Sequence, residues 1–406
     1  MHASTIATPR CISLIDRNTR TREDKVAVCA SRRGCGPRRV VRTPFTTLCE
    51  SKIETSTGGD IDRRTALFGA AALSQWVATT PSLAWAANLS PVTTADAVTV
   101  PNWTLEGGVN MPTLALNTVG LSVEDTVRAV RLARESGITH VDFHPGNERD
   151  GVARVIAMDG RDGLFLNTKI RKAPPGTSPA EAAEAARKQI DEDLKALNVD
   201  SVDMLMLRDS PDCDVIQAQW AVLEEARAQG KTRSLGVINF CQSALECLLQ
   251  SATVKPALNY CMLHVGMGPD AHGLRSFGEA QGIRFFAYGA VGEPGPEEEL
   301  LSSPLLARIG NAQKPKREPA EVALRWVLQS GAAVSVRPTT DFGPGTGICA
   351  EGAKCSAGIA ARAASVSWRL SQAQMAQLDA LTSPDANPTL FSSAGCPGSW
   401  GSLQAK

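Results

Sequence analysis

The strongest constraint on the fold is an alternation of short apolar segments with longer amphipathic ones. Segments such as 138–143 (ITHVDF) and 202–207 (VDMLML) are short and apolar on both faces, which is typical of strands in a sheet covered by helices. The segments between them carry apolar residues at helical spacing. One of these, 178–197, begins with Ser178 and Pro179, a usual start for a helix.

Eight such strand–helix units within about 250 residues favour a closed (β/α)8 barrel, the TIM-barrel architecture, over an open α/β sheet. A hairpin around Gly107 and Gly108 should lead into the first strand, within 104–118. Further strands are expected at 138–143, 164–169, 202–207, 233–239, 257–263, 283–288 and 332–336, and helices at 122–137, 148–158, 178–197, 215–230, 243–252, 273–281 and 318–331. A last helix, 371–381, lies outside the repeat. No Gly-x-Gly-x-x-Gly follows the first strand, which argues against a Rossmann fold.

The first 86 residues have the composition of a targeting leader rather than of a folded domain. Residues 1–59 lack periodicity, and through Arg42 they hold ten basic against three acidic residues, which is typical of a transit peptide. Residues 60–86 contain Arg63-Arg64, an uncharged apolar run and Ala84-Trp85-Ala86, the pattern of a twin-arginine export signal. The apolar run is too short for a membrane anchor, which needs about 20 residues. The order of these parts predicts a plastid transit peptide, cleavage near Ala86 and a protein of the chloroplast thylakoid lumen.

The remaining chain is predicted to be a lead segment (87–103), one barrel domain (104–384) with an insertion (341–358), and a tail (385–406). The leader holds 13 of the 42 basic and 7 of the 42 acidic residues, so 29 and 35 remain, a net charge near −6 that does not favour nucleic acid. We expect a monomer without a membrane span. Seven cysteines remain, none paired at zinc-ligand spacing, so no metal site is expected and one thiol must stay unpaired. Cys349 and Cys355 are candidates for a disulfide that closes a small loop.

Two predicted strands end in ionisable residues, Asp142 and Lys169. The C-terminal ends of the strands form the catalytic face of a (β/α)8 barrel. The two residues therefore mark the candidate active site, although an ion pair that only closes the barrel end is the simpler alternative.

Across roughly 104–384 the chain resembles the aldo-keto reductases. The resemblance rests on GGVNMPTLALNT, GITHVDF with GNE, NTKI, GKTRSLGVINF, PALNY, GIRFFAYGAVG, EVALRWVLQSG and WRLSQAQMAQLDAL, in this order. It implies an NADP(H)- or NAD(H)-dependent oxidoreductase acting on a small carbonyl or alcohol. In that family a tyrosine donates the proton, a lysine paired with an aspartate lowers the tyrosine pKa, and a histidine orients the carbonyl. Asp142 and Lys169 match the aspartate and the lysine.

The tyrosine and the histidine of the family pattern are not matched. Pro145 occupies the tyrosine position before Gly-Asn-Glu, and Arg208 replaces the histidine. The only two tyrosines, Tyr260 and Tyr288, lie far along the chain, so we expect no tyrosine near Asp142. His144 is a candidate proton donor because its reference pKa is about 6.5, and its simpler interpretation is a surface histidine. Arg208 can hold an oxyanion as a permanent cation.

The resemblance also implies a cofactor site. The matching residues are Thr118, Asn239, Tyr288, whose ring would stack on the nicotinamide, Tyr260 in place of a glutamine, and Arg337 for the adenosine 2′-phosphate. The glycines of the insertion would let backbone amides approach a phosphate, but a plain surface loop is the simpler interpretation.

Two functions follow from these patterns. The first is an oxidoreductase with an altered site, in which His144 or Arg208 replaces the lost groups. The alternative is a catalytically inactive barrel that binds a small ligand or a lumenal protein, because barrels host many functions.

Overall fold

The computed structural model describes residues 98–270, 273–292, 297–339, 349 and 352–381. The predicted transit peptide, export signal and C-terminal tail lie outside the described residues, as do residues 87–97 of the lead segment and most of the insertion before residue 352. Those predictions remain predictions.

Within the described residues, eight parallel strands close into a barrel in the order β10-β3-β4-β5-β6-β7-β8-β9. The strands are β3 (Leu114–Asn117), β4 (His140–Asp142), β5 (Phe165–Lys169), β6 (Val202–Arg208), β7 (Thr232–Ile238), β8 (Leu258–Met262), β9 (Arg284–Tyr288) and β10 (Ala333–Val336). The predicted (β/α)8 barrel is therefore confirmed.

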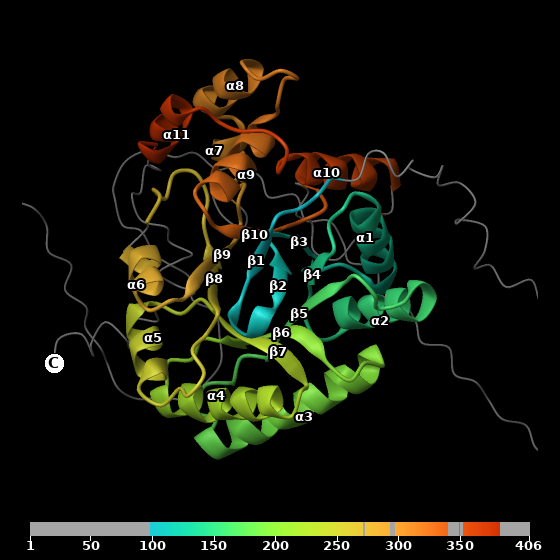
Figure 1. Ribbon diagram of the computed structural model, residues 1–406, viewed down its shortest axis with the longest axis vertical. Helices are drawn as coiled ribbons and strands as arrows, with labels where there is room; N and C mark the ends of the chain where they lie inside the picture. Colours follow the sequence, from blue (N-terminus) through green and yellow to red (C-terminus); the bar gives the residue numbers. More distant parts are fainter. Residues whose placement is uncertain (1–97, 271–272, 293–296, 340–348, 350–351, 382–406) are drawn as a thin grey trace, which may run out of the picture. The chain divides into compact units, whose positions relative to one another are not determined.

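Helices surround the strands (Figure 1). They are α1 (Val123–Glu135), α2 (Asn147–Asp159), α3 (Pro179–Leu197), α4 (Cys213–Ala228), α5 (Gln242–Leu249), α6 (Leu274–Ala280), α7 (Glu297–Leu301), α8 (Pro304–Asn311), α9 (Pro319–Gln329), α10 (Gly352–Ala364) and α11 (Gln372–Asp379). The predicted starts are confirmed for α1, which Ser122 caps, and for α3, where Ser178 and Glu181 form a capping box with Pro179 in the first turn. Gly137 follows α1 with a φ of 90°, and a Cβ there would meet the Val98 carbonyl oxygen at 2.1 Å, so only glycine fits.

The sequence prediction missed helices α8 and α10, of which α10 matters more, whereas the acidic run 297–299 reads as the first turn of a helix and begins α7. The loop expected over 341–358 is wrong from Gly352 onward, because α10 begins there and packs against α1 and α9, completing the ring of helices. Its sequence is rich in alanine and glycine and has few large apolar residues, so its helical period is weak. Gly358 lets α10 approach the segment after β10, since a Cβ would meet the Pro338 carbonyl oxygen at 2.1 Å. Helices α7 and α8 lie near α9 outside the ring, with α11 (Figure 1).

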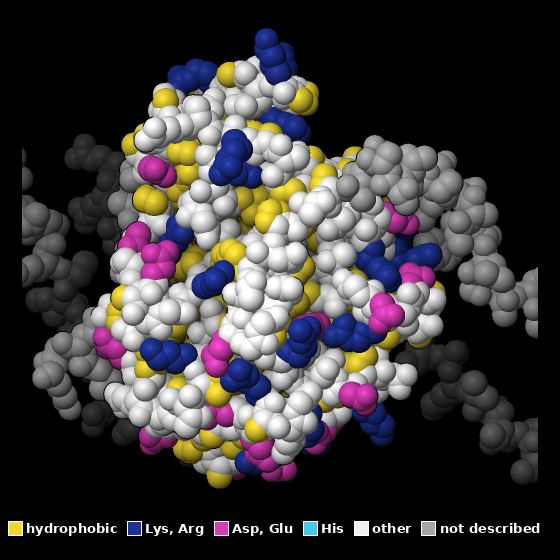
Figure 2. All heavy atoms as spheres, viewed as in Figure 1, with side chains coloured by type: hydrophobic (Ala, Val, Ile, Leu, Met, Phe, Trp, Pro, Cys, Tyr) yellow, Lys and Arg dark blue, Asp and Glu magenta, His cyan; other side chains and the backbone are white. Residues whose placement is uncertain are grey.

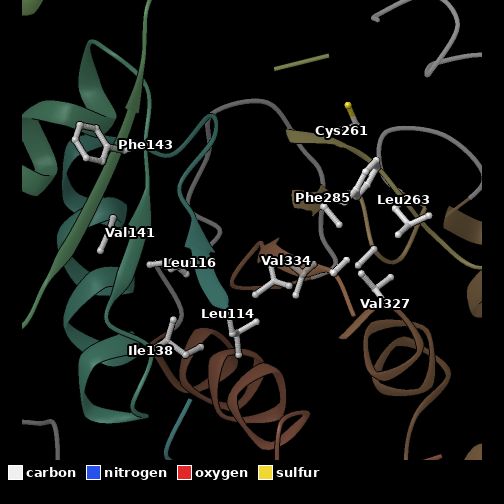
Figure 3. Packing of buried hydrophobic residues seen from close by; sticks show 14 of the residues in the cluster. Leu114, Leu116, Ile138, Val141, Phe143, Cys261, Leu263, Phe285, Val327 and Val334 are labelled. Atoms are coloured by element: carbon white, nitrogen blue, oxygen red, sulfur yellow. The ribbon is translucent and has the colours of Figure 1, made fainter. Parts of the chain in front are cut away.

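Side chains alternate strictly between the two faces of the barrel wall. Leu114, Leu116 and Val141 belong to the large apolar cluster between strands and helices, and Figure 3 shows them on the outer side of their strands. A separate cluster fills the barrel interior and includes Ala115 and Phe165 from the strands. This two-residue period brings the last inward residue of each strand to one end of the barrel.

The predicted hairpin closes the other end. Strand β1 (Asn102–Thr104) pairs antiparallel with β2 (Asn110–Pro112) across a 3₁₀ turn, η2 (Glu106–Gly108). Leu105, Val109 and Met111 insert into the interior cluster, so the hairpin closes the N-terminal end of the barrel with apolar side chains.

Disulfides link the helical layer. The predicted Cys349–Cys355 bond is confirmed, and Cys213–Cys247 joins the start of α4 to α5. Cys261 is free and buried. In the described residues no helix has both the length and the hydropathy to cross a membrane.

His140 is a buried histidine in the barrel interior. Its Nδ1 lies 2.9 Å from the Pro112 carbonyl oxygen of the hairpin, and its ring packs between Phe165 and Phe286. Burial lowers the pKa of His140 to about 4. The imidazole is therefore neutral at pH 7 and must gain its proton on unfolding in mild acid.

We predict that His140 makes the protein acid-sensitive. Between pH 5 and pH 6.5 the unfolded state binds this proton and the folded state does not, so the free energy of unfolding falls as the pH is lowered. From the depressed pKa, the loss between pH 7 and pH 5 is about 2 kcal/mol. Denaturant titrations at the two pH values should show a loss that is smaller by about this amount in His140→Asn, which keeps an amide donor for Pro112 and leaves the other buried histidines in place. Equal pH dependence in both proteins would contradict the prediction.

Candidate active site

A cavity of about 270 Å³ opens where the C-terminal ends of the barrel strands meet. Its lining residues are Asn117, Val119, His144, Lys169, Arg208, Ile238, Asn239, Tyr260, Tyr288, Gly289, Ser335 and Arg337. Seven of the nine predicted site residues are among them. Asp142 and Thr118 are fully buried and lie outside this lining.

The inward register of the strands explains this assembly. Asn117 is paired with Asp142 across β3 and β4, Asp142 with Asn167 across β4 and β5, and Ile238 with Tyr260 across β7 and β8. Lys169, Arg208 and Tyr288 are the last residues of their strands. The predicted residues therefore converge because they occupy equivalent positions in successive strands.

Asp142 is the most highly bonded side chain of the site. Its two carboxylate oxygens accept hydrogen bonds from the Lys169 ammonium, from Asn167 (3.1 Å), and from the hydroxyls of Tyr260 and Ser335 (2.7 Å each). Burial alone would raise the pKa of Asp142, but the Lys169 ammonium and these hydrogen bonds hold it below its usual value. Asp142 is therefore a fixed, ionised carboxylate.

Lys169 forms the predicted ion pair with Asp142, and it also donates to the Phe143 carbonyl oxygen at 3.2 Å. Burial lowers the pKa of Lys169, and Asp142 offsets part of this effect. The side chain is 1% exposed, so its charge acts through the low-dielectric interior.

His144 and Glu148 form a second bonded pair at the cavity wall. Glu148 Oε2 lies 2.9 Å from His144 Nδ1 and also accepts the backbone N–H of His144 at 2.9 Å. The ring is thereby oriented, and Nε2 is the nitrogen left for the cavity. Burial and the nearby Lys169 lower the pKa of His144, while Glu148 raises it in part. His144 is thus an imidazole held in one orientation by Glu148, with its pKa below the ordinary value, and not a free surface histidine.

Tyr260 corrects the expectation that no tyrosine lies near Asp142. Its hydroxyl donates to Asp142 at 2.7 Å and accepts from Asn117 at 3.1 Å, although Asp142 lies 118 residues away in the sequence. Burial and the Asp142 carboxylate raise the pKa of Tyr260 well above its ordinary value. The phenol therefore stays protonated, and its proton lies in the hydrogen bond that it donates to Asp142.

Asn239 and Tyr288 form one wall of the cavity. The Tyr288 hydroxyl donates to Asn239 Oδ1 at 2.9 Å, which leaves the Asn239 amide nitrogen as a donor. Asn239 has a φ of 57°, a left-handed conformation that asparagine tolerates better than most residues. Burial raises the pKa of Tyr288, so it also stays protonated.

Thr118 is the predicted cofactor residue that the structure keeps away from the cavity lining. Its hydroxyl lies 3.2 Å from the Asp142 carbonyl oxygen and 3.1 Å from Glu148 Oε2. It supports the Glu148 carboxylate, which in turn orients His144.

Sequence reasoning missed four polar residues of the site: Asn117, Glu148, Asn167 and Ser335. Their inward register was a usable signal for the three that lie on strands. Glu148, on the first turn of α2, was visible only as part of the GNE motif. Among the described residues no cluster of His, Cys, Asp and Glu is suited to a metal ion.

We predict that Lys169→Met leaves the Asp142 charge buried without its counter-ion. Breaking a buried ion pair typically costs about 3–5 kcal/mol of unfolding free energy. Adding Asp142→Asn to this variant removes the orphaned charge and should restore part of the loss. Denaturant titrations at pH 7 compare the three proteins, and a single variant within about 1 kcal/mol of the wild type would contradict this account of the pair.

Comparisons with known proteins agree with this geometry. The model of the aldo/keto reductase family matches residues 112–383. An aldo-keto reductase of Mycobacterium tuberculosis is 33% identical over 250 residues, which cover 60% of this chain and 83% of the relative.

Solved structures show the same fold. The aldo/keto reductase from Brucella melitensis has a TM-score of 0.57 at 25% identity, covering 70% of this chain and all of that chain. A variant of Gox0644 in complex with NADPH has a TM-score of 0.59 at 21% identity, covering 72% of this chain and 98% of that chain. The matched region contains every strand of the barrel, and the chain belongs to the aldo/keto reductase family.

Proposed function

We propose that this protein is an NADP(H)-dependent oxidoreductase that interconverts a small carbonyl compound and its alcohol. One observation carries the proposal. A single cavity at the C-terminal end of the barrel is lined by an oriented histidine, by Lys169, whose partner Asp142 is buried behind it, and by the Asn239–Tyr288 wall.

The lining fits a nicotinamide cofactor. The Tyr288 ring offers a flat surface for the nicotinamide, and the Asn239 amide nitrogen offers a donor for its carboxamide. Arg337 follows β10 and offers a cation for a cofactor phosphate. The NADPH complex of the structural neighbour adds support, since that protein shares the fold.

A second cavity, of about 390 Å³, supports NADP over NAD. Its lining includes Thr339, two residues after Arg337 in the sequence, and Lys354 and Arg362 of α10. Two glutamates of the α9 start, Glu318 and Glu321, also line it, and Glu321 is paired with Arg317 at 3.0 Å. The basic side chains of Lys354 and Arg362 in this lining suit the adenosine 2′-phosphate.

The proposed reaction divides the work among a few groups. NADPH, when bound, supplies the hydride that the carbonyl carbon accepts. His144 donates the proton from Nε2 to the carbonyl oxygen, and Glu148 stabilises the imidazolium through Nδ1. The products are the alcohol and NADP⁺. Lys169 is held by Asp142 as a fixed positive charge that favours negative charge developing on the oxygen.

We predict that His144→Gln lowers carbonyl reduction by about 10²- to 10⁴-fold, the usual contribution of a general acid. Because the protonated imidazole is the active form and the pKa of His144 lies below its ordinary value, the wild-type rate should fall as the pH rises through that pKa. NADPH oxidation with a panel of aldehydes and ketones measures both effects.

Tyr260→Phe is the matched control because the Tyr260 hydroxyl already donates to Asp142. We expect it to keep the falling pH limb that His144→Gln loses. A Tyr260→Phe variant as inactive as His144→Gln would assign the proton to the phenol instead. No turnover with any carbonyl would favour the inactive barrel that binds a ligand or protein partner.

A further inference from the structure

Arg208 is the group in the cavity whose role the proposed reaction leaves open. It is the last residue of β6, it is half-buried, and it lines the cavity beside Lys169 and Tyr288. No hydrogen bond or ion pair joins its guanidinium to another of the described side chains. A guanidinium carries five N–H donors and is charged at every physiological pH, so a half-buried one without an acceptor is unfavourable.

The neighbouring carboxylates are already bonded to other groups. Asp209, the next residue, is held by Lys172 at 2.8 Å, and the cavity lining does not include it. Asp142 is saturated by its four donors, and Glu148 is bonded to His144. None of these acids forms an ion pair with Arg208.

The cavity lining as a whole is cationic. It holds Lys169, Arg208 and Arg337 and no Asp or Glu side chain. Asp142 balances Lys169 from beneath, and the charge of Arg208 has no paired acid among the described residues. The face over the hairpin differs, because basic and acidic side chains are interspersed there (Figure 2). Among the described residues of this cavity's lining, Arg208 is thus a cation without a matching acid.

Resting on the proposed function, we propose that the substrate is a small carbonyl compound that carries a carboxylate, and that Arg208 binds this carboxylate. With Arg337 engaged by the cofactor, Arg208 is the permanent cation left for the substrate. Its planar fork matches a carboxylate through two parallel hydrogen bonds. The volume of about 270 Å³ restricts the substrate to a short chain.

A competing role for Arg208 is to hold the reacting carbonyl oxygen. The two roles differ in what they select. If Arg208 held the carbonyl oxygen, it would increase kcat/KM for neutral and acidic substrates alike. If it binds a carboxylate, it increases kcat/KM for acidic substrates alone, chiefly by lowering their KM.

The test compares three acids, glyoxylate, pyruvate and 4-oxobutanoate, with their methyl esters, in NADPH oxidation by the full chain. The wild type should prefer the best acid over its ester by about 10- to 100-fold in kcat/KM, the usual effect of a charge-assisted hydrogen bond. Arg208→Gln should raise KM for the acid by a similar factor and leave the ester nearly unchanged. Arg208→Lys, which keeps the charge, should keep part of the preference.

Arg187→Gln is the matched control. Arg187 lies on α3, its side chain is 49% exposed, and it is absent from the cavity lining, so its loss should change neither substrate class. The carboxylate assignment would be overturned if the wild type reduced esters with the same kcat/KM as acids, or if Arg208→Gln lowered kcat/KM equally for acids and esters. In either case the oxidoreductase function would stand. No turnover of any acid or ester, nor of any aldehyde or ketone of the wider panel, would overturn both.

Discussion

The buried ion pair of Asp142 and Lys169 determines how the rest of the candidate site is arranged. Two charges taken out of water are tolerated only when they are paired and their remaining hydrogen-bonding capacity is used. Asp142, on β4, therefore accepts hydrogen bonds from three other strands. The donors are Lys169 and Asn167 on β5, Tyr260 on β8 and Ser335 on β10. The bond from Tyr260 joins β8 to β4 on the opposite side of the barrel, and together these bonds form the floor of the cavity.

Groups above that floor are arranged differently. His144 is oriented through Glu148 with one nitrogen left over, Asn239 keeps a donor after bonding Tyr288, and Arg208 has no protein acceptor among the described side chains. A rigid, saturated floor beneath walls with spare hydrogen-bonding capacity is what a site requires if it is to bind a ligand without rearranging. The fold alone does not choose the reaction, since barrels host many.

Much of this could be predicted from the sequence, because the repeat of strands and helices specifies the barrel and the two-residue period aligns Asp142, Lys169, Arg208 and Tyr288 at one end. The contact between Tyr260 and Asp142 could not. Residues distant in sequence meet across a closed barrel, and side-chain length decides which ones touch. Helix α10 was missed because small residues give a weak helical period. The predicted lumenal location remains a prediction, and the bonds Cys213–Cys247 and Cys349–Cys355 between described residues suit an oxidising compartment.

The most direct test of the central claim, that this cavity is a nicotinamide site, is a titration of the protein with NADPH, followed by nicotinamide fluorescence. Asn239→Gly is the informative variant because glycine keeps the left-handed backbone while it removes the amide donor, together with the oxygen that accepts from Tyr288. The account predicts saturable binding to the wild type and about 10-fold weaker binding to the variant, the value of one hydrogen bond. Absence of binding at millimolar NADPH, or equal binding by both proteins, would contradict it.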